Sequence, residues 1–207
     1  MQTTIYLIRH SKPMKEEIID VYNTDLLPVY GPKTALSIDG EKKAEAISRW
    51  VELKNIDKVY SSNYVRAVST AKYIAHENNS CIYIHENLGE RKHGIINWNQ
   101  LPSDFEQRQK DEPSFKIGNG ESQIEVANRM YNVIYNILNE NLGKRIAIIS
   151  HATAITFLFM KLGEYKNNSV YYKEKVVIPE NFNWDAPEVF KLVFEDNELL
   201  SIENIRK

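Results

Sequence analysis

The sequence has very little of three features that would each define a class of protein. Cys81 is the single cysteine among 207 residues, which excludes an intrachain disulfide framework and a cysteine-rich metal cluster. No apolar run approaches the roughly 20 residues of a membrane-spanning helix. Positive charge is not in excess, since 26 Lys and Arg face 28 Asp and Glu. That balance argues against binding nucleic acid through bulk positive charge, so we expect neither nucleic-acid nor membrane partners.

The length and composition are those of an ordinary globular protein. A chain of 207 residues can bury roughly 70% of its extended surface without help from metals or disulfides. We therefore expect a single domain over residues 1–207. Residues 1–20 lack a basic start followed by an apolar core and a cleavage site, so a cytoplasmic protein is expected. No sequence pattern predicts the oligomeric state.

Short β-rich runs alternate with segments of helical periodicity. The expected strands are residues 4–8, 58–60, 81–84, 145–149 and 189–194, and the last of these forms a terminal hairpin with residues 199–202. The run 145–149 is almost entirely apolar, which is typical of a strand covered on both faces in a parallel sheet. The alternation predicts an α/β fold, a three-layer α/β/α sandwich with a mostly parallel central sheet.

Three helices are expected from apolar residues that recur on one face. These residues are Ala44, Ile47 and Val51 in the first helix, Ala67, Ala71, Ile74 and Ala75 in the second, and Ala127, Met130, Ile134, Ile137 and Leu138 in the third. Ser122 and Glu125 have the spacing of a capping box at the start of the third helix. Gly143 is expected to mark its end.

Three segments depart from this alternation: residues 11–36, 95–120 and 162–187. Unstructured segments of this length in a compact domain are often lids or binding loops. The segment 162–187 is rich in aromatic residues, including Tyr165, Tyr171 and Trp184. Two interpretations stay open for each segment: a lid-like excursion over one edge of the sheet, or a surface excursion with some helix of its own.

Charged and histidine side chains follow the expected strands. Arg9-His10 ends the first strand, Ser61-Ser62 ends the second, and Ser150-His151 ends the fourth. Arg66 follows Ser61-Ser62 in the next helix, and Glu90 and Arg91 follow strand 81–84. Ligands of open α/β sheets bind beyond the carboxyl ends of the strands. Two histidines, two or three arginines and a carboxylate are therefore expected to converge on one rim.

These residue types suit phosphoryl transfer. A phosphoryl group spreads negative charge over three oxygens, and guanidinium forks match its geometry. Arg9, Arg66 and His151 form the expected cage, to which amides at the helix start near Ala152 can add. One imidazole would attack phosphorus, and a carboxylic acid would protonate the leaving oxygen.

With these residues in place, the chain resembles the histidine phosphatase superfamily, also called the phosphoglycerate mutase-like family. Six motifs carry the resemblance, in order and over most of the chain: Leu7-Ile8-Arg9-His10, Leu36-Ser37-x-x-Gly40-x-x-x-Ala44, Ser61-Ser62-x-x-x-Arg66-Ala67-x-x-Thr70-Ala71, Leu88-x-Glu90-Arg91-x-x-Gly94, Gly120-Glu121-Ser122 with Val126 and Arg129, and Ile148-Ile149-Ser150-His151.

The resemblance implies a role for each matching residue. His10 would be the nucleophile that becomes phosphorylated, and Glu90 the proton donor and later the base for water. Arg9, Arg66 and His151 would hold the phosphoryl oxygens. The resemblance implies no metal and no cofactor. Substrate contacts are also expected from three further residues, Ser61, Arg91 and Ala152.

Departures from the family pattern separate the possible activities. Ser11-Lys12-Pro13 replaces the usual Gly, acidic residue and Ser or Thr, and Glu16 stands where mutase-like members carry Asn. These changes favour a histidine acid phosphatase-type enzyme that hydrolyses a small phosphomonoester. A phosphoglycerate mutase-type transfer between hydroxyls and a non-catalytic phosphate-binding protein remain as alternatives.

Overall fold

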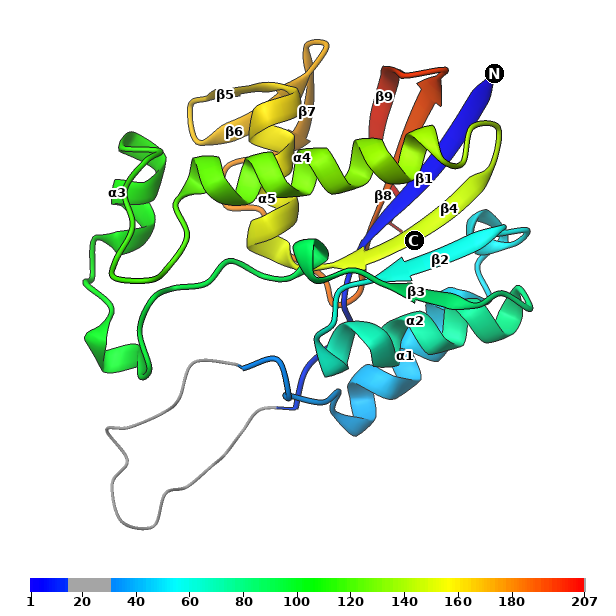
Figure 1. The fold of residues 1–207 in the computed structure, drawn as a ribbon, viewed down its shortest axis with the longest axis horizontal. Coiled ribbons are helices and arrows are strands. Elements are labelled where there is room, and N and C mark those ends of the chain that lie inside the picture. The colour runs from blue at the N-terminus through cyan, green and yellow to red at the C-terminus, as the bar shows by residue number, and fades with distance from the viewer. Residues whose placement is uncertain (15–30, 207) are drawn as a thin grey trace.

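A six-stranded sheet lies between two layers of helices in the computed structural model, which describes residues 1–14 and 31–206 (Figure 1). The strands of this sheet are β1 (Gln2–Arg9), β2 (Lys58–Ser61), β3 (Ile82–Ile84), β4 (Arg145–Ser150), β8 (Glu188–Glu195) and β9 (Glu198–Asn204). The helices are α1 (Ile38–Ser48), α2 (Val65–Glu77), α3 (Phe105–Asp111), α4 (Gln123–Asn139) and α5 (Ala152–Leu162). The predicted α/β sandwich is confirmed.

The strand order is β3-β2-β4-β1-β8-β9. The pairs β2–β3, β2–β4 and β1–β4 are parallel, and β8 is antiparallel to both β1 and β9. The register aligns Arg9 with Ser150 and Ser61 with Ile149. The carboxyl ends of β1, β2 and β4 therefore lie together at one edge of the sheet.

The central strands are apolar at successive positions because they face two cores. Ile5 and Leu7 of β1 join the core formed with α4 and α5, whereas Tyr6 and Ile8 join the core formed with α1 and α2. β4 alternates in the same way. Side chains of a strand point to opposite faces in turn, so both faces must be covered to bury such a run.

The start of α4 has the predicted capping box. Ser122 Oγ accepts from the Glu125 amide at 3.2 Å, and a Glu125 carboxylate oxygen accepts from the Ser122 amide at 2.9 Å. The predicted end is wrong, because α4 ends at Asn139 and Gly143 lies in the turn before β4 with a φ of 76°. The left-handed backbone there explains the glycine.

The predicted burial of Val51 is also wrong. This residue was expected on the buried face of the first helix, but α1 ends at Ser48 and Trp50 has an extended backbone. The break changes the helical phase, so Val51 lies in the short 3₁₀ turn Val51–Leu53 with its surface 82% exposed. Ala44 and Ile47 are buried as predicted.

The three irregular segments have different structures. Most of residues 11–36 lies outside the described residues, including Glu16; its ends meet where Pro13 pairs with Leu36. Residues 95–120 contain the 3₁₀ turn Trp98–Gln100 and α3. Residues 162–187 form no helix beyond the end of α5; they form the antiparallel sheet of β5 (Glu164–Lys166), β6 (Ser169–Tyr172) and β7 (Lys175–Ile178). Within residues 1–14 and 31–206, no helix has the length and apolar character needed to cross a membrane.

Candidate active site

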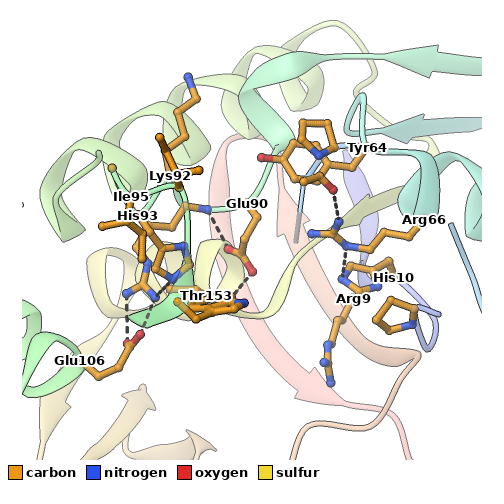
Figure 2. A pocket seen from close by; sticks show the side chains of 17 residues that line it. Arg9, His10, Tyr64, Arg66, Glu90, Lys92, His93, Ile95, Glu106 and Thr153 are labelled. Atoms are coloured by element: carbon orange, nitrogen blue, oxygen red, sulfur yellow. Dashed lines mark hydrogen bonds and ion pairs between the residues drawn. The ribbon is translucent and has the colours of Figure 1, made fainter. Parts of the chain in front are cut away.

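A cavity of about 530 Å³ opens at the carboxyl ends of the parallel strands. Arg9, His10, Arg66 and Glu90 line one part of it, and residues of the 91–98 segment line another (Figure 2). The sequence thus brings its candidate phosphoryl-handling groups together. The cavity is large enough to hold a leaving group beyond the phosphoryl group itself.

His10 is buried and held in one tautomer. Its Nδ1 lies 2.6 Å from the Ser11 carbonyl oxygen, which only accepts, so Nδ1 carries the hydrogen and donates it. Nε2 then presents a lone pair, which accepts from Arg66 Nε at 3.0 Å. Burial, reinforced by the charges of Arg66 and Arg9, holds the pKa of His10 well below its usual value. The imidazole is therefore neutral and nucleophilic at physiological pH.

Arg66, at the start of α2, joins the two site histidines. Besides its bond to His10, it donates through Nη2 to His151 Nδ1 at 3.3 Å and through Nη1 to the Gly31 carbonyl at 3.1 Å. The Tyr64 ring lies 4.8 Å from the guanidinium carbon. The histidine rings are 5.0 Å apart. Arg66 is thus fixed beside Nε2 of His10.

His151 is fully buried behind this guanidinium. Since Arg66 only donates, His151 Nδ1 accepts, and the remaining hydrogen on Nε2 is donated to Ser62 Oγ at 2.8 Å. Burial, His10 and Arg66 lower the pKa of His151 well below its usual value. Sequence reasoning placed Ser62 at a strand end but gave it no role. Its position beside Ser61 in the same motif was the available signal.

Arg9 reaches the cavity from the end of β1. Its Nη1 donates to the carbonyl oxygens of Trp184 and Asp185 at 2.9 and 3.0 Å. Its Nε is buried without a hydrogen-bond partner among the described residues. These carbonyls fix the guanidinium without neutralising it, so its charge is available to an anion. The end of the 162–187 segment touches the site through this contact.

Glu90 projects into the cavity with its carboxylate held by backbone amides. Oε1 accepts from the amides of Arg91 and Ala154 at 2.9 and 3.0 Å, and Oε2 accepts from Thr153 at 3.3 Å. The start of α5 was expected to hold a phosphoryl group near Ala152. Instead, its amides bind Glu90, and Thr153 rather than Ala152 lines the cavity.

The loop that carries Glu90 is tied down by Arg129 of α4. Arg129 donates to the carbonyl oxygens of Asn87, Gly89 and Glu90 at 2.8, 2.9 and 3.1 Å. It also pairs with both carboxylate oxygens of Glu121 at 2.7 and 3.0 Å. Three hydrogen bonds from one side chain therefore fix the backbone on which Glu90 stands, and two more hold that side chain against Glu121.

Two of the expected substrate contacts are directed elsewhere. Arg91 is buried and pairs with both carboxylate oxygens of Glu106, at 2.6 and 3.1 Å, and with Gln109 at 2.7 Å. It lines the cavity, but its charge is already paired. Ser61 is fully buried and donates to the Ser62 carbonyl at 2.9 Å. Neighbouring groups hold both side chains, and Arg91 Nε is buried without a hydrogen-bond partner among the described residues.

Known proteins resemble this chain in sequence. The family model of the histidine phosphatase superfamily (branch 1) matches residues 5–173. A curated relative named "Probable phosphoglycerate mutase GpmB", from Photorhabdus laumondii, is 27% identical over 158 residues, covering 73% of this chain and 70% of the relative.

Two solved structures share the fold at low identity. Mycobacterial glucosyl-3-phosphoglycerate phosphatase superposes with a TM-score of 0.72 at 15% identity, over 99% of this chain and 97% of that one. Phosphoserine phosphatase from Entamoeba histolytica gives a TM-score of 0.69 at 18% identity, over 99% and 98% of the two chains.

Proposed function

Because the chain belongs to the histidine phosphatase superfamily (branch 1), we propose that it hydrolyses a small phosphomonoester through a phosphohistidine on His10. One observation carries the proposal. His10 is a buried, neutral imidazole whose Nε2 lone pair lies beside Arg66, in a cavity that Arg9 also lines. This arrangement supplies an uncharged nucleophile and the cations that a phosphoryl group requires.

The proposed reaction has two displacements at phosphorus. In the first, His10 Nε2 bonds to phosphorus, the bond to the ester oxygen breaks, and the carboxylic acid of Glu90 gives its proton to that oxygen. In the second, Glu90 takes a proton from water, whose oxygen bonds to phosphorus as the phosphorus–nitrogen bond breaks. Glu90 is thereby protonated again and inorganic phosphate is released. Arg66 exchanges its bond to Nε2 for one to a phosphoryl oxygen when the ester binds.

The chain's own cations perform the electrostatic work in this proposal. Arg9 and Arg66 offer guanidinium donors to the developing charge, and His151 lies directly behind Arg66. Stabilisation by preorganised donors is usually the largest part of catalysis in such reactions. The proposed phosphatase therefore needs neither a metal ion nor an organic cofactor.

A mutase is the second candidate, since the curated relative is named as one. It would use the same histidine and return the phosphoryl group to a second hydroxyl instead of to water. A non-catalytic phosphate-binding role is disfavoured, because His10, Arg9, Arg66, Glu90 and His151 are all present.

The decisive experiment measures hydrolysis of p-nitrophenyl phosphate and a panel of metabolite phosphates in the presence of a chelator. We expect turnover, with an acid-labile phosphoenzyme trapped during the reaction. His10→Ala should abolish both, and His76→Ala, at an exposed position of α2, is the matched control. Full activity of a folded His10→Ala variant would disprove the assignment. Conversion of 3-phosphoglycerate to 2-phosphoglycerate without phosphate release would establish the mutase.

Glu90→Gln provides a second test. Alkyl phosphates need a proton on the leaving oxygen, whereas p-nitrophenolate leaves without one, so the variant should slow alkyl esters far more. Equal slowing of both esters would mean that Glu90 is not the acid.

A further inference from the structure

Resting on the phosphatase proposed above, we propose that the preferred ester has an uncharged, ring-bearing leaving group and not a carboxylate-bearing one. The part of the cavity beyond the phosphoryl-handling residues points to this substrate class. Its described lining offers apolar and aromatic surface, and its charged side chains are either paired with each other or directed away.

The apolar surface comes from the loop after Glu90. Ile95, Ile96 and Trp98 line the cavity, together with the rings of His93 and Tyr64. The exposed fraction of Ile96 is 75%, which is unusually high for an isoleucine. The His93 and Trp98 rings meet edge to face with centroids 4.9 Å apart. A flat, apolar leaving group would bury this surface, and aromatic pairing adds to the gain.

The buried cation nearest to this surface is already neutralised. Arg91 is 4% exposed and forms a two-bond pair with Glu106, which also lines the cavity. Paired guanidinium and carboxylate groups match in geometry and in charge. A carboxylate on the substrate would have to compete with Glu106 for Arg91 while being repelled by Glu106.

The two other basic side chains of the loop do not supply a cation to the cavity. His93 Nε2 accepts from Arg91 Nη2 at 2.8 Å, so that ring is neutral. Burial, with the charge of Arg91 as a second cause, lowers the pKa of His93 to about 4. The Lys92 side chain lines the rim, and its ammonium group points away from the other labelled side chains (Figure 2).

The inference is tested with three alkyl phosphates of similar intrinsic reactivity. Benzyl phosphate has an uncharged ring, glycerol 3-phosphate is uncharged without a ring, and 3-phosphoglycerate carries a carboxylate. We expect kcat/KM to be at least tenfold higher for benzyl phosphate than for glycerol 3-phosphate. The value for 3-phosphoglycerate should be lower again.

Variants assign this preference to the cavity wall. Trp98→Ala should reduce the benzyl-to-glycerol ratio of kcat/KM about tenfold, mainly through KM, and Trp98→Phe should restore most of it. Ile96→Ala should reduce the ratio about threefold. The matched control is Ile84→Ala on the edge strand β3, where the side chain is 52% exposed and outside the cavity; it should leave the ratio unchanged.

Glu106→Gln tests the charge argument in the opposite direction. It leaves Arg91 without its counter-charge, so kcat/KM for 3-phosphoglycerate relative to benzyl phosphate should rise about tenfold. An enzyme that hydrolyses 3-phosphoglycerate or phosphoserine as well as benzyl phosphate would overturn the inference and leave the phosphatase intact. The inference would also be overturned if the Trp98 and Ile96 variants left the benzyl-to-glycerol ratio of kcat/KM unchanged and Glu106→Gln left the 3-phosphoglycerate-to-benzyl ratio unchanged. Absence of His10-dependent hydrolysis of every ester would overturn both proposals.

Discussion

Replacing Arg129 with lysine should damage proton transfer from Glu90 more than phosphoryl binding. Arg129 donates three hydrogen bonds to carbonyl oxygens of residues 87–90 and two to Glu121. Lysine keeps the positive charge beside Glu121, but its single ammonium group cannot reproduce the planar fork. The loop would then lose most of its fixed contacts while His10, directly after β1, keeps its own.

The structure sets the size of the expected effects. A hydrogen bond to a charged group contributes about 1.5–3 kcal/mol, and these contributions are not additive, so we expect a loss of about 2–4 kcal/mol in unfolding free energy. A shift of about 1 Å in a reacting group can cost about 100-fold in rate. The kcat for an alkyl phosphate should therefore fall about 100-fold. The kcat for p-nitrophenyl phosphate, which needs little protonation, should fall less than about tenfold.

The assay compares kcat and KM for both esters in the Arg129→Lys variant, with unfolding followed by chemical denaturation. Arg49→Lys is the matched control, because Arg49 is an exposed residue at the end of α1, and neither it nor its ion-pair partners Glu45 and Glu77 line the cavity. Equal losses for the two esters in a folded Arg129→Lys variant would refute the reasoning. So would an unchanged rate for the alkyl ester.

Three further outcomes follow from burial and hydrogen bonding. Met130→Ala removes a fully buried side chain of α4 and should lower the free energy of unfolding in urea by about 2–5 kcal/mol. The control Ile124→Ala, at a half-exposed position of the same helix, should lower it by less than about 1 kcal/mol. Similar losses in the two variants would contradict the core assignment. His10 and His151 have folded-state pKa values well below the unfolded value of 6.5, so the unfolded chain binds more protons and stability falls as the pH drops below about 6.5. Each ring should lower the unfolding free energy by about 2 kcal/mol between pH 7.5 and pH 5. The His10→Gln variant should show a stability–pH profile that is flatter by that amount. An unchanged profile would contradict the assigned shift. Ser62→Ala removes the acceptor for His151 Nε2–H, so imidazole nitrogen NMR should show a changed tautomer or hydrogen-bond shift; an unchanged spectrum would rule out this contact.

Local sequence pattern was sufficient to predict the secondary-structure elements that carry the site. The apolar run 145–149 identified a strand covered on both faces, because such a run is stable only between two helical layers. Ser122 and Glu125 marked the start of α4 because a capping box is a contact within four residues. The same reasoning failed at Val51, where a backbone break after α1 changed the helical phase. A break of this kind leaves little trace in the spacing of apolar residues.

The order of strands and motifs in the sequence also brought Arg9, His10, Arg66 and His151 to one rim, since parallel strands share their carboxyl edge. Only the tertiary structure decided how these and neighbouring groups are paired. Glu90 takes the α5 amides that were expected to bind phosphate, Arg91 turns to Glu106, and Ser62 meets His151 across 89 positions of the chain. Such partners depend on side-chain direction and on contacts between distant segments. Local periodicity and composition do not contain that information, so the sequence identified the candidate groups and the fold assigned their hydrogen bonds.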